Sequence, residues 1–224
     1  MSDYVVAAVG EWNRRLFDQK IKNLKGNWYF SSSPEELSEI LQVTSPRYLF
    51  FPHWRWIVPK NILDHYECVC FHMTDVPYGR GGSPLQNLIM RGHKNTVLTA
   101  LQMEEGLDTG PVYFKKSLSL SGDAYEIYQR MAALSWDMIL NFIEKEPRPS
   151  PQIGEPVIFK RRVSNDSKIP VGLDLEQVYD YIRMLDAPGY PPAFIEYGDL
   201  YLEFNKAELK GNELVASVKI RNKK

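Results

Sequence analysis

Short apolar runs alternate with helical patterns in the first third of the chain. The predicted strands are Tyr4–Val9, Asn27–Phe30, Arg47–Phe51 and Glu67–Phe71. Between the first two strands, Glu11–Lys22 carries apolar residues at the spacing of an amphipathic helix. Ser33, followed by Pro34, has the pattern of a helix N-cap. This order predicts an α/β fold with a Rossmann-like, open, mostly parallel sheet and helices on both faces.

The rest of the chain continues with helical and extended segments. The sequence predicts helices over Pro84–Met90 and Asp123–Ile143 and extended segments over Thr96–Met103 and Pro111–Leu120. Prolines then break the pattern at 147–151, which indicates a linker. A short helix at Leu175–Leu185 and two alternating stretches, Leu200–Phe204 and Leu214–Ile220, follow; the stretches could pair as a hairpin. We expect a catalytic core over residues 1–146, and a linker with a small C-terminal α+β extension over 147–224.

Charge and cysteine content restrict the function classes. The chain has 27 basic and 28 acidic side chains, a formal net charge of −1, so nucleic acid is an unlikely partner by charge. The basic cluster that ends at Lys224 is expected to be a frayed terminus. Cys68 and Cys70 are spaced poorly for a disulfide or zinc, which favours a cytoplasmic protein without metal. The N-terminal apolar run is too short for a signal peptide or a membrane span.

One loop has the composition of a reactive site. His72 ends a predicted strand and is followed by a loop rich in glycine and proline, up to the helix that begins at Pro84. In an open parallel sheet, ligands bind beyond the C-terminal ends of the strands. The first strand ends in a single Gly10, so neither a dinucleotide fingerprint nor a P-loop is present. The loop after His72 is therefore the best candidate for the site.

The motifs around this loop resemble those of the folate-dependent formyltransferases. His72, Pro77, Arg80-Gly81 and Pro84 reproduce the family pattern H-x-S-x-L-P-x-x-R-G-x-x-P, with Thr74 in the place of its serine. Further segments at 92–99 and 103–110 are similar to the family's G-x-x-x-T-G-V-T and M-x-x-G-x-D-T-G-D motifs. The resemblance runs from about residue 48 to 118 and implies N10-formyltetrahydrofolate as the co-substrate.

The resemblance also implies roles for individual residues. His72 and Asp108 correspond to catalytic residues of the family, and the loop that holds the pterin ring corresponds to Trp54, Arg55, Trp56 and Ile57, with Asp108 also at the folate. The family's third catalytic residue is an Asn two positions before the His, where this chain has Cys70. A thiol is a weak donor, so Thr74 and Asn87 are further candidates for stabilising the oxyanion.

These residue types suit the transfer of a formyl group to an amine. The amine attacks the formyl carbon, which produces a tetrahedral oxyanion, and the nitrogen loses a proton. An imidazole can exchange that proton near neutral pH. A carboxylate beside the ring would orient it and favour its charged form.

The acceptor is less constrained than the chemistry. A short C-terminal part and a balanced charge argue against tRNA, so the resemblance favours the sugar N-formyltransferases of polysaccharide biosynthesis, acting on a nucleotide-linked amino sugar such as a UDP-linked 4-amino-4,6-dideoxy sugar. The candidate acceptor-binding residues are Trp12, Asn13, Tyr78, Arg80 and Gln86. Two alternatives are a methionyl-tRNA formyltransferase and a non-catalytic relative that binds folate or a sugar nucleotide. A homodimer is possible through the predicted hairpin.

Overall fold

The computed structural model describes residues 1–223, so the last residue of the predicted basic cluster, Lys224, lies outside the described residues. The chain forms two compact units. The first consists of Met1–Gly81, Thr96–Leu118 and Gln129–Ile158, and the second of Gly82–Asn95, Ser119–Tyr128 and Phe159–Lys224. The predicted division after residue 146 stays a prediction.

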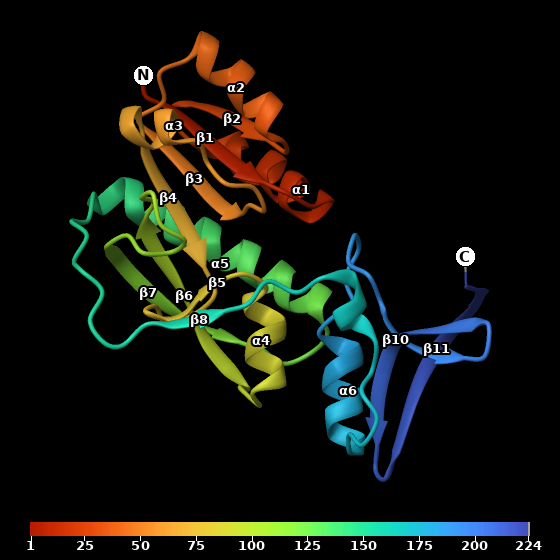
Figure 1. The fold of residues 1–224 in the computed structure, drawn as a ribbon. Coiled ribbons are helices and arrows are strands. Elements are labelled where there is room, and N and C mark those ends of the chain that lie inside the picture. The colour runs from red at the N-terminus through yellow and green to blue at the C-terminus, as the bar shows by residue number, and fades with distance from the viewer. Residues whose placement is uncertain (224) are drawn as a thin grey trace. The chain divides into compact units, whose positions relative to one another are not determined.

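A six-stranded sheet forms the centre of the first unit, in the strand order β2-β1-β3-β4-β6-β7 (Figure 1). Its strands are β1 (Asp3–Ala8), β2 (Asn27–Ser31), β3 (Tyr48–His53), β4 (Glu67–His72), β6 (Asn95–Gln102) and β7 (Val112–Ser119). The first four pair in parallel, whereas β6 runs antiparallel to β4. The predicted α/β fold with a mostly parallel sheet is therefore confirmed.

Alternate residues of β3 explain why helices cover both faces of this sheet. Leu49 and Phe51 belong to an apolar cluster with Leu37 of α2 (Pro34–Val43), and Ile62 and Leu63 of α3 (Lys60–His65) pack against it. The residues between them face the opposite way. The rings of Tyr48 and Phe50 lie 5.1 and 5.7 Å from that of Phe142 in α5 (Ala124–Lys145).

Local signals account for most helix boundaries in this unit. Ser33 caps α2 as predicted, because its hydroxyl oxygen accepts a hydrogen bond from the Glu36 backbone N–H at 3.2 Å. Helix α1 spans Glu11–Lys20 and continues as a 3₁₀ turn, η1, over Ile21–Asn23. Helix α3 was not expected from the sequence, since it is a single short segment without a Ser, Thr, Asp or Asn cap.

The second unit contains a separate antiparallel sheet and two helices. The sheet has the order β11-β10-β9 and consists of β9 (Ala193–Tyr197), β10 (Leu200–Lys210) and β11 (Glu213–Asn222). Strands β10 and β11 form the predicted hairpin across Gly211. Helix α4 spans Pro84–Met90, as predicted, and α6 spans Leu175–Arg183 and packs against β10.

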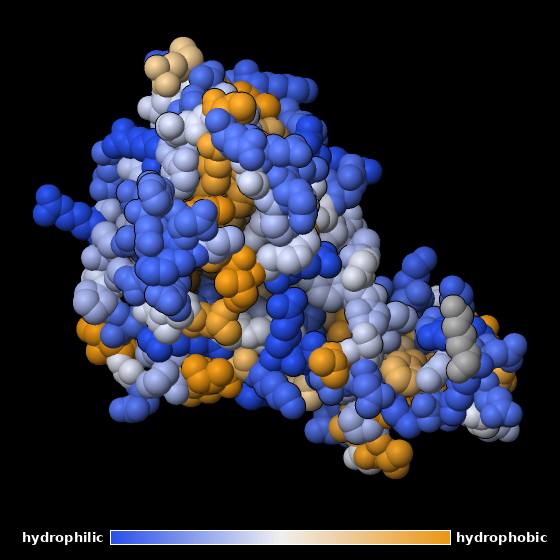
Figure 2. All heavy atoms as spheres, turned by 45° about the horizontal axis from the view of Figure 1, so that its top comes forward, coloured by the Kyte–Doolittle hydropathy of each residue, from blue (hydrophilic) through white to orange (hydrophobic). Residues whose placement is uncertain are grey.

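Smaller elements complete the description. A two-stranded sheet joins β5 (Tyr78–Gly81) and β8 (Val157–Phe159), and a 3₁₀ turn, η2, spans Ser164–Ser167. On the face drawn in Figure 2, apolar side chains occur in separate groups within a mostly hydrophilic surface. Within residues 1–223, none of the helices combines the length and the apolar character needed to cross a lipid bilayer.

Candidate active site

His72 occupies the last position of β4, and its side chain is 7% exposed. Its Nε2 lies 2.8 Å from the Gly79 carbonyl oxygen, and its Nδ1 lies 3.5 Å from Oδ1 of Asp108. Both neighbouring atoms are hydrogen-bond acceptors. A neutral ring can donate to only one of them, whereas the imidazolium can donate to both at once. The structure therefore brings together the two residues that the motifs single out.

Asp108 lies in the loop between β6 and β7 and is held by backbone contacts. Its Oδ2 accepts a hydrogen bond from the Gly81 N–H at 2.9 Å, which leaves Oδ1 to face His72. Gly81 has a φ of 103°, a conformation that a side chain would strain. Asp108 itself has a φ of 54°, which Asp tolerates better than most residues do. The carboxylate thus has a defined direction toward the imidazole.

The turn that follows Asp108 depends on a close backbone approach at Gly110. A Cβ at this position would lie 1.9 Å from the Gln102 carbonyl oxygen. Close by, the Gln102 N–H donates to the Pro111 carbonyl at 2.9 Å, which closes the base of the loop. Glycine is required here because the loop folds tightly against the end of β6.

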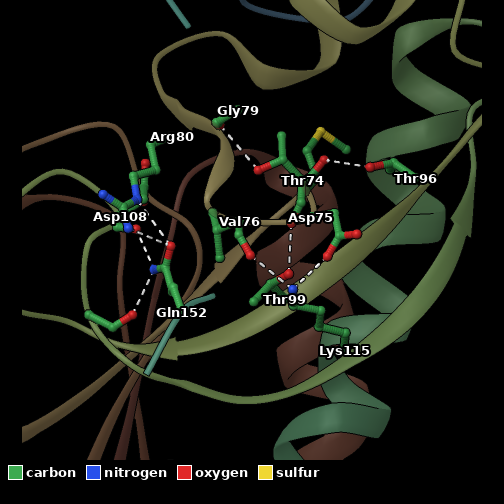
Figure 3. A network of polar contacts seen from close by, with 12 residues as sticks. Thr74, Asp75, Val76, Gly79, Arg80, Thr96, Thr99, Asp108, Lys115 and Gln152 are labelled. Carbon is green, nitrogen blue, oxygen red and sulfur yellow. Dashed lines mark hydrogen bonds and ion pairs between the residues drawn. The ribbon is translucent and has the colours of Figure 1, made fainter. Parts of the chain in front are cut away.

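Gln152 is a site residue that sequence reasoning missed. Its Nε2 donates to the carbonyl oxygens of Asp108 and Gly110 at 2.8 and 2.7 Å. Its Oε1 accepts from Nε and Nη2 of Arg80 at 3.0 and 2.9 Å. Figure 3 shows Gln152 beside Arg80 and Asp108, joined to them by these contacts. It directly follows the proline-rich break at 147–151, in the part of the chain that the sequence pattern indicates as a linker, so no local signal marks it.

The three candidates for oxyanion stabilisation differ in whether their protons already donate to backbone carbonyls. Thr74 is fully buried, and its hydroxyl donates to the Gly79 carbonyl at 3.1 Å. The amide of Asn87 belongs to the second unit, where it donates to the carbonyls of Gly82, Ser83 and Lys160. Burial and the charge of Asp108 raise the pKa of the Cys70 thiol well above its usual range, so it keeps its proton.

The loop predicted to hold the pterin follows β3 and is partly exposed. The rings of Trp54 and Trp56 lie 4.8 Å apart, and the Arg55 guanidinium lies over the Trp56 ring at 5.5 Å. Trp54 also packs edge-on against Phe51, whereas Ile57 is 75% exposed. Trp54 thus joins the apolar core, and the outer part of the loop remains accessible. The pterin-binding role stays a prediction.

A hollow of about 250 Å³ lies between α3 and the loop that leads to Asp108. Its lining residues are Lys60, Leu63, Asp64, Gln102, Met103, Glu104 and Glu105. Ligand sites for whole drug-sized molecules usually measure about 300–1,000 Å³. This hollow is therefore smaller than a site that holds a whole ligand of that size.

The predicted acceptor-binding residues do not form one group. Asn13 is buried and donates to the Val9 carbonyl at 2.7 Å, and the Trp12 ring lies 5.8 Å from that of His53. Tyr78 is partly buried in β5. Gln86 belongs to the second unit and is 3% exposed, with its amide nitrogen bonded to the Tyr128 hydroxyl and the Met184 carbonyl.

These placements bear on the predicted binding roles. The contacts of Asn13 and Gln86 are those of residues that hold the fold together, and they argue against direct ligand binding. Two hydrogen-bond donors of Arg80, Nε and Nη2, are occupied by Oε1 of Gln152. Among the residues described, no cluster of three or more His, Cys, Asp or Glu side chains could hold a metal ion.

Two family models match most of the chain. The model described as formyl transferase matches residues 15–142, which is more than half of the sequence. The model described as methionyl-tRNA formyltransferase, C-terminal domain, matches residues 164–221. The first match includes both His72 and Asp108, and the second covers the α6 and β9–β11 region.

Individual relatives agree with these matches. A methionyl-tRNA formyltransferase from Clostridium thermocellum is 43% identical, with a TM-score of 0.95 over 100% of both chains. A methionyl-tRNA formyltransferase from Campylobacter curvus is 30% identical over 78% of this chain, which spans 58% of that relative. A 4-N formyltransferase from Francisella tularensis is 14% identical, with a TM-score of 0.67 over 100% of this chain and 98% of its own, and shares the fold.

These relatives correct two predictions made from the sequence. The predicted amino-sugar acceptor, with its link to polysaccharide biosynthesis, is wrong, because the relative that is 43% identical over its full length is a methionyl-tRNA formyltransferase. The expectation that nucleic acid is an unlikely partner is contradicted by the same relatives. Net charge was a poor basis for this expectation, because it is a sum over the whole chain and does not show where basic side chains gather on the surface.

The prediction of a formyl-transferring enzyme agrees with the family models. The paired His72 and Asp108, the glycine-dependent loops around them and the match over residues 15–142 lead to the same conclusion. The chain belongs to the formyl transferase family.

Proposed function

We propose that this protein is a methionyl-tRNA formyltransferase. It moves the formyl group of N10-formyltetrahydrofolate to the α-amine of methionine carried by a tRNA. The observation that carries the proposal is the 43% identity, over the whole of both chains, to a protein described by that name. The match of residues 164–221 to a C-terminal domain of the same enzymes supports the tRNA acceptor independently.

His72 and Asp108 supply the proton chemistry of this transfer. A carbonyl oxygen only accepts, so the ring Nε2 carries a proton that it donates to the Gly79 carbonyl. Nδ1, which faces Asp108 Oδ1, is then the ring atom that can exchange a proton. As the amine attacks the formyl carbon and the bond to the folate nitrogen breaks, Nδ1 takes the amine's proton beside the Asp108 carboxylate and later passes it to that nitrogen.

Cys70 is the best candidate for the oxyanion donor. The protons of Thr74 and Asn87 are committed to backbone carbonyls. The raised pKa of Cys70 keeps its S–H intact, and this weak donor replaces the stronger amide that the resemblance implies. The transition state is therefore stabilised less than an amide at that position would stabilise it.

The folate is held by the first unit. The hollow between α3 and the loop after β6 would receive one part of it, and the carboxylates of Asp64, Glu104 and Glu105, which line this hollow, would accept hydrogen bonds from its ring amino groups. Trp54 and Trp56 provide aromatic surface beside the loop after β3. When bound, the folate supplies the activated formyl group.

A direct assay of acceptors tests this function. The purified protein is incubated with radiolabelled N10-formyltetrahydrofolate and either methionyl-tRNA, uncharged tRNA or a UDP-linked 4-amino sugar. Label is expected in the methionine of the charged tRNA alone. Label in the sugar, or none in charged tRNA with folate-saturated enzyme, would refute the proposal.

A further inference from the structure

The side chain of Gln152 connects two loops of the active site. It makes four described hydrogen bonds, all between 2.7 and 3.0 Å. In two of them, Oε1 of Gln152 accepts from the guanidinium of Arg80, which lies in the segment between His72 and α4. In the other two, Nε2 of Gln152 donates to the backbone carbonyls of Asp108 and Gly110. One side chain therefore links the segment after His72 to the loop that carries its carboxylate partner (Figure 3).

The backbone next to Gln152 is itself anchored. Ser150 forms an antiparallel bridge with Val112, in which each N–H donates to the other's carbonyl at 2.8 Å. Val112 is the first residue of β7, directly beyond the Asp108 loop. Gln152 thus approaches the loop from a fixed point on the sheet, although the next residue, Ile153, is 91% exposed.

The loop needs such support because Asp108 has an unusual backbone conformation. Its φ of 54° leaves its carbonyl oxygen outside any regular ladder, and Gln152 supplies the donor for that oxygen. On the other side, Asp108 Oδ2 is held by the Gly81 N–H. Backbone and side chain of Asp108 are therefore fixed from two directions, and Oδ1 is directed to His72 as a result.

We propose that Gln152 is a positioning residue that acts through Asp108 to set the orientation of the His72 ring. Its described hydrogen bonds go to Arg80, Asp108 and Gly110, and none of them goes to His72. Its amide is matched to the task because one end accepts from Arg80 while the other end donates to two carbonyls. A carboxylate would keep the first contact and lose the second. This inference rests on the proposed function only for its kinetic consequence.

The sharpest test is a double-mutant cycle with a spectroscopic readout. The four proteins are wild type, Gln152→Ala, Asp108→Asn and the double variant. The ring ¹⁵N signals of His72 are recorded by NMR at neutral pH and are assigned by their loss in His72→Asn. Gln152→Ala should move these signals toward those of Asp108→Asn, and should change nothing further when Asn is already at position 108.

Kinetics supply the second readout. Gln152→Ala and Gln152→Glu should each lower kcat about tenfold or more, as expected when a catalytic group is displaced by a fraction of an ångström. KM for the folate should change by less than about twofold. In the Asp108→Asn background, Gln152→Ala should cost less than about twofold in kcat. Gln42→Ala, at an exposed position of α2, is the matched control and should behave as wild type.

Two results would overturn the role of Gln152. One is a set of His72 ring signals in Gln152→Ala that matches wild type. The other is an equal change in both backgrounds, which is the behaviour of a residue that supports only the fold. A protein that transfers no formyl group to methionyl-tRNA would refute the proposed function, while the ring signals would still decide this inference.

Discussion

At the scale of single residues, the environment of each side chain decides its chemistry more than its type does. Cys70 and His72 are two positions apart on β4, and both lie near Asp108. The carboxylate disfavours a thiolate at Cys70. The Cys70 thiol therefore keeps its proton at neutral pH.

Replacement of Cys70 tests its role as the oxyanion donor. Cys70→Asn should raise kcat by roughly three- to tenfold, because a well-placed amide donor in such a site is worth about 10²–10³ in rate and a thiol supplies only part of this. The measurement is steady-state formyl transfer at saturating folate, with Cys68→Ala as the control. A fall in kcat in Cys70→Asn, with unchanged melting temperature, would show that the oxyanion is stabilised elsewhere.

His53, at the end of β3, should make stability depend on pH. Burial, aided by the charge of Arg55, lowers the pKa of His53 from 6.5 to about 4. Below about pH 6.5 the His53 side chain is protonated in the unfolded chain, whereas in the folded chain it is protonated only below about pH 4. The stability present above pH 6.5 is lost as the pH falls through this window, by up to about 3 kcal/mol.

Urea unfolding between pH 4 and pH 7 checks this effect. His53→Gln should flatten the dependence of the free energy of unfolding on pH over that window, whereas His65→Gln, on exposed α3, should retain the slope of wild type. Identical slopes in wild type and His53→Gln would contradict the assignment.

At the scale of elements, the active site depends on how loops return to the sheet. The loop between β6 and β7 begins where the Met103 N–H donates to the Cys68 carbonyl at 2.8 Å, so it lies against β4 from its first residue. It then reaches Asp108 near Cys70 and His72. The site thus consists of residues of β4 and of the loop that follows the neighbouring strand β6.

Gly110→Ala tests this close approach. The added Cβ would meet the Gln102 carbonyl, so the loop must move and Asp108 must leave its place beside His72. We expect kcat to fall by at least about tenfold, measured in the formyl-transfer assay. The control is Gly92→Ala, where a Cβ meets nothing within 4 Å but φ is 77°; it should cost stability but retain kcat. Full activity in Gly110→Ala would refute the requirement for glycine.

Most elements could be predicted from the sequence, and the exceptions have physical reasons. Apolar runs located β1 to β4, and the Ser33-Pro34 signal located α2. Helix α3 is too short for periodicity to show, and β9 was missed because three of its five residues are exposed. Isolated short segments of this kind are stabilised by tertiary contacts, which a local pattern does not contain.

The site could be predicted only in part for the same reason. His72 follows from its place at a strand end, whereas Asp108 was found through the family resemblance. Gln152 contacts residues 44 and 72 positions away, and nothing in its own segment indicates this. Asn87 and Gln86 had suitable side chains, but both are occupied by bonds within the second unit.

At the scale of the whole molecule, composition was a poor guide to the acceptor. A short C-terminal part and a net charge of −1 led to the expectation of a sugar, whereas the relative that is 43% identical over the whole of both chains is described as a methionyl-tRNA formyltransferase. Binding to tRNA requires basic groups only where phosphates lie, and acidic groups elsewhere cancel them in the sum. The proposed tRNA acceptor is compatible with a balanced chain for this reason.

The rate of formyl transfer to methionyl-tRNA by Asp108→Asn tests the account most directly. The amide is of similar size but lacks the charge that orients and stabilises the His72 ring. We predict that kcat falls by at least about a hundredfold relative to wild type, with an unchanged melting temperature and about the same KM for tRNA. A variant that transfers the formyl group at the wild-type rate would contradict the central claim that His72 and Asp108 act as a pair.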